Sequence, residues 1–466
     1  MNKRIFIKKL AVLILIVTVL MNSSAASSDD MMNEILSKAD DLKEFIGLND
    51  YIPPDAINVS VHGYAELAEC LENFSSNWED KFYIINLEDG DYNITNPIEW
   101  GKMDTHKKFI LNGNNKTIDG RHKHEFMNLY NDLKVSNLNV VNTHSSTGNE
   151  SSVISMKSPR RLKIENCSFS NNVGDKKGCV ITNRGKTSIN NSVFTNNTVK
   201  EVGGSIWSTG EHGGTLVLTN NTFKDNVANK DLNHERTAIV YMVSGGDNVI
   251  NNNSFVNNNG RCIHSFNKTN TKIVDNRFIN NTINDSEVIR GGVIDNYESD
   301  ITVANNVFDG DKSMGELRGG IIYHEIGYMN FSNNVVNNYH IKEDPSNNTN
   351  CSKGGVVFNR NASVDITSNA FNNTLQANMS RGGVIYNNLG NITLKDNNFT
   401  NHVVDMNVSG LCVYNDVNSI INASGNVFNS ILNGKSFSSD EKEKYIFNSR
   451  QQNNESNGTQ AVTYYS

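Results

Sequence analysis

The side chains that could do chemistry lie in four short clusters of histidine and acidic residues. These clusters are His122, His124 and Glu125; His234, Glu235 and Arg236; Asp295, Glu298 and Asp300; and His324 with Glu325. Carboxylates of this kind could flank a glycosidic bond as acid and base, or hold Ca²⁺ through several oxygens. No cluster recurs along the chain, so solvated loop residues are the preferred interpretation of each. His122–Glu125 is the cluster to mutate first.

Two landmarks recur along the sequence and must position any such residues. A Gly-Gly pair stands at Gly203, Gly291, Gly319, Gly354 and Gly382, with degenerate copies at Gly178-Cys179, Thr237-Ala238, Arg261-Cys262 and Gly410-Leu411. A phenylalanine stands at Phe169, Phe194, Phe223, Phe255, Phe278, Phe308, Phe371, Phe399 and Phe428, with Val336 in the one gap. The mean period is about 29 residues, and a period of this size is typical of a solenoid of stacked repeats.

The two landmarks divide each repeat into a constant part and a variable part. With the degenerate copies at Thr237 and Arg261 set aside, the distance from a Gly pair forward to the next Phe is 16–20 residues, whereas from Phe to the next Gly pair it is 9–18 residues. Insertions confined to one place in a repeat project from one face of a solenoid, and that face often binds. We therefore expect a recognition surface between each Phe and the next Gly pair.

The constant part has the composition of strands joined by tight corners. Val364 and Ile366, and then Ile392 and Leu394, alternate with polar residues as in a strand with one buried face. Asn stands two residues before the Phe landmark in eight of ten repeats, at a corner where it would adopt a left-handed backbone and form a ladder. The Gly pair suits a second corner with positive φ. These features predict an all-β, right-handed parallel β-helix of the pectin-lyase-like class, in preference to an up-and-down β-sandwich.

The register between coils decides which candidate residues meet. Asp295 directly follows a Gly pair, so it could stack near Asp247 or near His264 on a neighbouring coil. The sequence leaves both options open.

The ends of the chain differ from the repeat. Residues 1–26 combine a basic start with an apolar run and small residues, as in a signal peptide; an uncleaved membrane anchor is the alternative. Residues 27–60 form an acidic lead-in. Residues 61–80 include GYAELAECLENF, which places Leu67, Cys70, Leu71 and Phe74 on one face of a short capping helix. The β-helix is expected over residues 81–432, and a polar tail over 433–466.

Composition narrows the function. The formal net charge is −8, and charges of both signs are interspersed, so nucleic-acid binding is not indicated. The six cysteines show no metal-type spacing and are read as free thiols, although Cys167–Cys179 is the pair nearest in sequence. We predict no catalytic, metal or cofactor residues. Sequons such as Asn93, Asn196, Asn280, Asn372, Asn391 and Asn407 could be glycosylated in an exported protein.

The repeat resembles a known family. The alternation of GG-x-[ILV], as in Gly382–Ile385, with F-x-x-N, as in Phe278–Asn281, is similar to the β-helix repeats of polymorphic outer-membrane-protein-type adhesins. The Asn-rich style and the segment Leu87–Gly120 resemble the adhesin-like proteins of methanogenic archaea. The resemblance covers about residues 60–430 and implies a secreted or cell-surface adhesin. F-x-x-N lapses at Phe308, Phe371, Phe399 and Phe428.

Three functions remain after this reading. The first is a non-catalytic, secreted or cell-surface protein that binds glycans or partner cell surfaces through loops on one face. The second is a polysaccharide lyase or glycoside hydrolase on the same fold. The third is a structural envelope protein without a discrete ligand.

Overall fold

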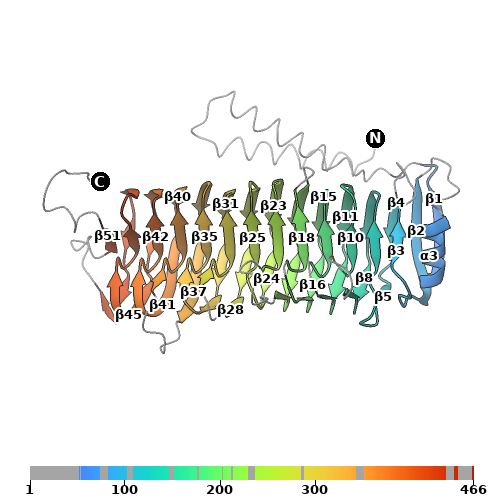
Figure 1. The fold of residues 1–466 in the computed structure, drawn as a ribbon, viewed down its shortest axis with the longest axis horizontal. Helices are drawn as coiled ribbons and strands as arrows, with labels where there is room; N and C mark the ends of the chain where they lie inside the picture. Colours follow the sequence, from blue (N-terminus) through green and yellow to red (C-terminus); the bar gives the residue numbers. More distant parts are fainter. Residues whose placement is uncertain are drawn as a thin grey trace, which may run out of the picture. The chain divides into compact units, whose positions relative to one another are not determined.

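The computed structural model is a right-handed parallel β-helix, as the sequence predicts (Figure 1). It describes residues 52, 54–73, 82–101, 109–145, 152–175, 178–201, 203–210, 214–228, 237–284, 288–342, 351–436, 445–449 and 464–465. The chain divides into Met1–Asp55 and Ala56–Ser466, and the second unit contains the solenoid. Three sheets run along it, and each coil passes from sheet C to sheet A and then to sheet B.

Sheets A and C contribute one strand each to a coil. The 15 strands of sheet A are β1 (Ile57–Gly63), β2 (Tyr83–Asp91), β4 (Phe109–Asn112), β7 (Leu133–Ser136), β11 (Arg161–Glu165), β15 (Lys186–Asn190), β19 (Thr215–Thr219), β23 (Asp247–Asn251), β26 (Asn270–Val274), β31 (Asp300–Ala304), β36 (Tyr328–Ser332), β40 (Ser363–Thr367), β43 (Asn391–Lys395), β47 (Ile420–Ser424) and β52 (Tyr464–Tyr465). The 13 strands of sheet C are β3 (Ile98–Trp100), β6 (Met127–Leu129), β10 (Ile154–Met156), β14 (Ile181–Asn183), β18 (Ile206–Thr209), β22 (Val240–Val243), β25 (Ile263–Phe266), β30 (Ile294–Tyr297), β35 (Ile322–Glu325), β39 (Val357–Arg360), β42 (Ile385–Asn388), β46 (Val413–Asn415) and β51 (Ile446–Asn448).

Sheet B follows the Asn corner and includes the Phe landmarks. Its first strands in successive coils are β5 (Thr117–Asp119), β8 (Asn139–Val141), β12 (Ser168–Ser170), β16 (Val193–Thr195), β20 (Thr222–Lys224), β24 (Ser254–Val256), β27 (Arg277–Ile279), β32 (Val307–Asp309), β37 (Val335–Lys342), β41 (Ala370–Arg381), β44 (Asn398–Phe399) and β48 (Val427–Phe428). All pairs between coils are parallel, whereas the short strands β49 (Ile431–Leu432) and β50 (Lys435–Ser436) form an antiparallel hairpin.

The Phe landmarks form the predicted stack inside the solenoid. They pair in register from Phe169 to Phe308, and their ring centroids lie 4.7–5.1 Å apart. Val336 takes the next place, as predicted. The space left by its smaller side chain is filled by Phe331 of β36, whose ring lies 6.5 Å from Phe308 and 6.2 Å from Phe371. A neighbouring sheet thus supplies the aromatic ring that this coil lacks.

The asparagine ladder is present, but its backbone differs from the prediction. From Asn221 to Asn426, each ladder Asn donates through Nδ2 to the Oδ1 of the next, at 2.9–3.1 Å. The left-handed residue is the one before it, for example Asn305 (φ 58°) before Asn306. The expectation that the ladder Asn adopts positive φ is wrong. Its side chain is selected because it satisfies buried backbone groups of the neighbouring coils.

The two glycines of each pair serve different needs. The first has positive φ, as predicted, for example 72° at Gly382. The second lies too close to the next coil for a side chain, since a Cβ on Gly383 would meet the carbonyl oxygen of Leu411 at 2.2 Å. The pair therefore brings the backbones of neighbouring coils together at the start of sheet C.

The described strands extend beyond residues 81–432. Strand β1 precedes helix α3 (Tyr64–Asn73) and pairs with β2, while β51 continues sheet C after β46. Helix α3 lies at the N-terminal end of the solenoid and buries Leu67 and Leu71 (Figure 1). Phe74 and the predicted signal peptide, residues 1–26, lie outside the described residues. No described helix is long and apolar enough to span a membrane.

Candidate functional site

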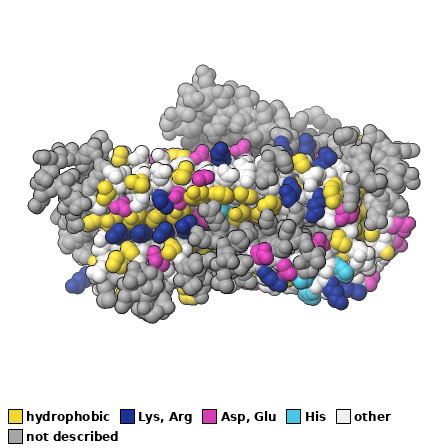
Figure 2. Space-filling model, in the orientation of Figure 1, with side chains coloured by type: hydrophobic (Ala, Val, Ile, Leu, Met, Phe, Trp, Pro, Cys, Tyr) yellow, Lys and Arg dark blue, Asp and Glu magenta, His cyan; other side chains and the backbone are white. Residues whose placement is uncertain are grey.

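The outward face of sheet C carries a column of aromatic residues along most of its length. The second residue of each strand points away from the core, and the strand pairing places these residues in one register. The column consists of Trp207, Tyr241, His264, Asp295, Tyr323, Phe358, Tyr386, Tyr414 and Phe447. Figure 2 shows it as a hydrophobic stripe that follows the long axis of the molecule.

The C-terminal half of this aromatic column is tightly stacked. From Tyr323 to Phe447 the ring centroids of neighbouring coils lie 5.0–5.2 Å apart, with interplanar angles of 4–18°. The ring faces are therefore used by the neighbouring rings, and Tyr323 and Tyr386 are each only 1% exposed. Such stacking stabilises the outer face of the sheet. It also means that a ligand would meet the groups on either side of the column rather than the ring faces.

A row of cations lies along one side of the column, on the residues that precede the Gly pairs. Arg290 of β29 (Ile289–Arg290), Arg318 of β34 (Leu317–Arg318), Lys353 of β38 (Ser352–Lys353) and Arg381 of β41 are in register on four successive coils. All four are partly exposed. Like charges directly opposite one another destabilise a sheet, so this arrangement has an electrostatic cost. We call these four residues the cation row.

The aromatic column contacts three cations of the cation row. Arg290 lies 5.7 Å from the ring centroid of Tyr323, Lys353 lies 5.5 Å from that of Tyr386, and Arg381 lies 5.4 Å from that of Tyr414. These three cations thus lie within cation–π distance of a ring of the following coil, beside the stacked neighbouring rings. Figure 2 shows Lys and Arg side chains in a line beside the hydrophobic stripe.

Carboxylates lie on the opposite side of the column and are already engaged. Glu325 accepts a hydrogen bond from the hydroxyl of Tyr323 and forms an ion pair with Arg360 at 3.3 Å. Asp416 accepts hydrogen bonds from the hydroxyl of Tyr386 and, at 3.0 Å, from Asn388 Nδ2. The two sides of the column therefore differ in charge: one has a line of cations, and the other has carboxylates that are already hydrogen-bonded.

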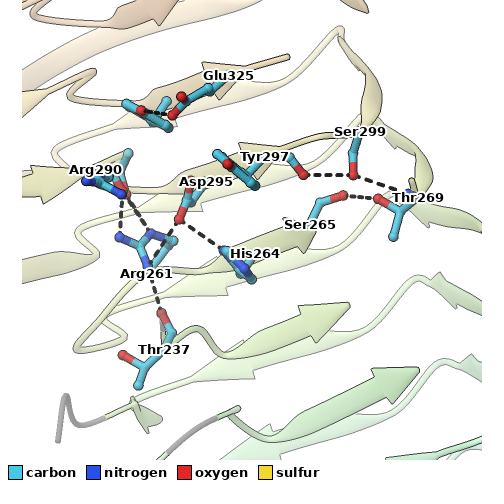
Figure 3. Close-up of polar contacts among 12 residues, drawn as sticks. Thr237, Arg261, His264, Ser265, Thr269, Arg290, Asp295, Tyr297, Ser299 and Glu325 are labelled. Carbon is cyan, nitrogen blue, oxygen red and sulfur yellow. Dashed lines mark hydrogen bonds and ion pairs between the residues drawn. The ribbon is translucent and has the colours of Figure 1, made fainter. Parts of the chain in front are cut away.

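The aromatic column is interrupted at one place by a buried charge cluster (Figure 3). Arg261 occupies the register position that Gly292 has in the next coil, and Asp295 occupies a position that is aromatic in its C-terminal neighbours. Asp295 Oδ2 lies 3.0 Å from His264 Nδ1 and 3.8 Å from Arg261 Nη1. Arg261 and Asp295, which both depart from the repeat, therefore balance each other in charge.

The guanidinium of Arg261 is held firmly by backbone carbonyls. Its Nη1 donates to Thr237 O at 3.1 Å, and its Nε donates to Arg290 O at 3.1 Å and to Gly291 O at 2.9 Å. The His264 ring stacks on Tyr241 at 4.6 Å and is fully buried, while Asp295 is 3% exposed. A His–Asp pair can orient a general base. In this packing, however, the pair fills a break in the column and has no open approach for a substrate.

The predicted clusters lie in different environments. His122 lies with positive φ in an exposed turn, and Asp300 is exposed, so the solvated interpretation holds for both. It is wrong for Asp295, which pairs with His264 and not with Asp247. It is also wrong for His324, which is inside the solenoid, where burial lowers its pKa to about 4 and keeps it neutral.

Other predictions about chemistry have mixed outcomes. His234, Glu235 and Arg236 lie outside the described residues. Across the described part of the chain, no group of three His, Cys, Asp or Glu side chains could hold a metal ion. All six cysteines are free, including Cys167 and Cys179.

The variable part of the repeat is only partly loop. In the later coils it continues sheet B, with β41 extending over 12 residues and β45 (His402–Ser409) pairing with it in parallel. Extra residues are therefore absorbed as longer strands in these coils. Parts of the predicted loops, including residues 229–236 and 343–350, lie outside the described residues.

The aromatic column and cation row were not identified from the sequence, although their signal was available. In three coils the Gly pair is preceded by Arg or Lys and followed three residues later by Tyr or Phe, as in Arg381–Tyr386. The Gly pairs predict corners. The strand register is needed to assign the residues that flank them to a face of the sheet.

Comparisons with known proteins concern the fold. No family model matches the sequence, and no curated protein matches it. Among solved structures, the A-module of mannuronan C-5 epimerase AlgE6 from Azotobacter vinelandii aligns with a TM-score of 0.42 and 14% identity, over 79% of this chain and 93% of the module. PfbA, a surface adhesin of Streptococcus pneumoniae, aligns with a TM-score of 0.34 and 11% identity, over 76% of this chain and 88% of that chain. At this level of similarity the likeness concerns architecture alone.

Proposed function

We propose that this protein is a non-catalytic, secreted or cell-surface adhesin that binds extended glycans along the outward face of sheet C. The cation row, held in register on four coils beside a rigid aromatic column, is the observation that carries the proposal. The resemblance of the repeat to adhesin-like proteins is in keeping with this role.

The rigidity of the scaffold supports a binding role. In the C-terminal half, each coil is hydrogen-bonded to its neighbours and fixed by two stacks, one of Phe inside and one of Tyr and Phe outside. A preorganised surface loses little conformational entropy when a ligand binds, and this favours affinity. A solenoid also repeats its surface at about 4.8 Å per coil, which suits a ligand that is itself a repeating chain.

A site-directed block tests the location of binding. The full chain is screened for binding to intact cells and to a panel of neutral and acidic glycans. Cysteine is then introduced at Asn388, on the outward face of sheet C, and coupled to a bulky maleimide. The matched control carries the same label at Thr393, which is exposed on sheet A of the same coil. The unsubstituted protein treated with maleimide corrects for labelling of the native cysteines.

We expect the label at Asn388 to abolish binding and the label at Thr393 to leave it unchanged. Equal binding by both labelled proteins would remove sheet C as the site. Polysaccharide cleavage is the second candidate: the Arg261–Asp295–His264 cluster on the same face pairs a histidine with a carboxylate, but its side chains are buried. Release of oligosaccharides by the wild-type protein, together with its loss in Asp295→Asn, would establish an enzyme instead.

A further inference from the structure

The cation row is a local concentration of positive charge on a chain that is negative as a whole. The chain as a whole has a formal net charge of −8. Despite this, Arg290, Arg318, Lys353 and Arg381 stand one per coil along a straight line. At about 4.8 Å per coil, the line extends over roughly 14 Å. A run of like charges at this spacing is unfavourable by itself, and an anionic ligand would relieve the repulsion.

Within the described residues, three of these cations have no carboxylate partner. Some cations elsewhere on the surface are paired, as Lys134 and Lys163 are with Glu165 at 2.9 and 2.8 Å. Arg318, Lys353 and Arg381 form no such ion pair. The carboxylates nearest on this face, Glu325 and Asp416, are engaged by tyrosine hydroxyls on the other side of the column.

The contacts with the aromatic column do not by themselves occupy all the N–H donors of the cations. A cation–π contact uses the face of a guanidinium or one side of an ammonium group, and does not consume the N–H donors that bind anions. Arg381 lies over the ring of Tyr414 in this way, at 5.4 Å. Arginine binds a carboxylate through two parallel N–H···O bonds, so an oriented guanidinium is a ready partner for a planar acid group.

We propose that the ligand of this surface is an acidic polysaccharide, bound along the solenoid axis with its carboxylates on the cation row. The inference rests on the proposed function and specifies the chemical class of the glycan. One acidic sugar would face each cation, while the polar side chains across the column, such as Asn388 and Arg360, would meet hydroxyls. A nucleic acid is disfavoured because its dense phosphate charge would also meet a chain of net charge −8.

Polymer binding provides the test. Binding of the full chain to polygalacturonate, dextran sulfate, neutral dextran, single-stranded DNA and phosphatidylserine vesicles is measured by biolayer interferometry. We expect polygalacturonate to bind best, and its affinity to fall as NaCl is raised from about 0.1 M to about 1 M, because exposed charges are then screened. Preferred binding to DNA or to vesicles would overturn the proposal, as would equal affinity for neutral dextran.

Charge variants locate the interaction. The triple variant Arg318→Gln, Lys353→Gln, Arg381→Gln should weaken polygalacturonate binding by about tenfold or more, since each exposed ion pair contributes a factor of a few. The control triple variant Lys224→Gln, Lys272→Gln, Lys395→Gln changes the net charge equally at exposed sites on sheets A and B, and should bind within about twofold of wild type.

A purely structural role for the cation row makes a different prediction. In that case the triple variant would melt at a lower temperature but keep its affinity at temperatures where it is folded, and the proposal would fail. The double variant Arg318→Lys, Arg381→Lys keeps the charge and should retain most of the binding. If neutral and acidic glycans bind equally well and the triple variant is unaffected, the ligand class is wrong while the adhesin function stands. If no glycan and no cell binds, the proposed function itself fails.

Discussion

At the scale of single residues, Asp311 stands where the preceding coils have a buried asparagine. The preceding coils place Asn172, Asn197, Asn226, Asn258 and Asn281 in a second ladder, three residues after each Phe. Asp311 ends that ladder: it accepts from Asn281 N at 2.7 Å and Nδ2 at 2.9 Å, while its Oδ2 is buried and has no partner in the described structure. Burial raises the pKa of this carboxyl from 3.8 to about 7.

The raised pKa gives Asp311 a pH-dependent effect on stability. The folded state holds the proton up to about pH 7, whereas the unfolded chain releases it near pH 4, so the contribution present at low pH is lost as the pH rises to 7. Asp311→Asn removes the titrating carboxyl, and with it the loss of stability at high pH, and supplies an N–H donor. We expect it to raise stability by about 1–3 kcal/mol at pH 8 and by much less at pH 4. Calorimetric melting at the two pH values measures the difference. The same substitution at an exposed site of the solenoid, Asp247→Asn, is the matched control.

At the scale of the element, the corner between sheets A and B separates two roles that the sequence presents together. In pairs such as Asn305-Asn306, the sequence pattern assigns both the left-handed backbone and the ladder to the second residue. In the structure Asn305 has the positive φ. Asn306 makes the ladder: its Nδ2 donates to Ile273 O at 2.9 Å and to Asn334 Oδ1 at 3.1 Å. The fold, the Phe register and the existence of the ladder could be predicted, because they depend only on periodicity.

The two asparagines should therefore respond differently to substitution. Asn305→Gly should be nearly neutral, because glycine adopts positive φ without strain. Asn306→Gly and Asn306→Ala should each cost about 1–3 kcal/mol, because buried backbone groups lose their partners. Urea denaturation midpoints compare the three variants. A neutral Asn306→Gly combined with a costly Asn305→Gly would show that backbone conformation, and not hydrogen bonding, selects asparagine at the ladder position.

The candidate site was harder to predict than the corner, for a physical reason. Whether two residues of neighbouring coils meet depends on the lengths of the variable segments between them. His264 and Asp295 are 31 residues apart and pair, whereas Phe255 and Phe278 are 23 apart and also pair. The sequence offered Asp247 and His264 as equal neighbours of Asp295, and only hydrogen-bonded register could decide. The same uncertainty concealed the alignment of the cation row.

At the scale of the whole molecule, the solenoid should tolerate the loss of one complete coil. Between β39 and β42, between β40 and β43, and between Phe371 and Phe399, the paired residues are 28 positions apart. Deletion of residues 354–381 removes one such period. It joins Lys353 to Gly382, so that a cation still precedes a Gly pair and the native residues still follow it. Because each coil contacts only its neighbours, the shortened protein should fold and keep its β-sheet circular dichroism. Its long axis should shorten by about 4.8 Å in small-angle X-ray scattering.

A half-coil deletion supplies the control for this prediction. Loss of residues 354–367 would join the end of a sheet B strand to the corner that follows sheet A. Apolar and polar positions would then no longer stack from coil to coil. We expect this variant to aggregate or to remain unfolded. The complete deletion also removes one cation, Arg381, while Lys353 takes its place beside Gly382. The row then contains three charges and not four, so affinity for polygalacturonate should fall by a factor of a few without loss of fold. Equal affinity of the shortened and full-length proteins would mean that the row does not act as one extended site.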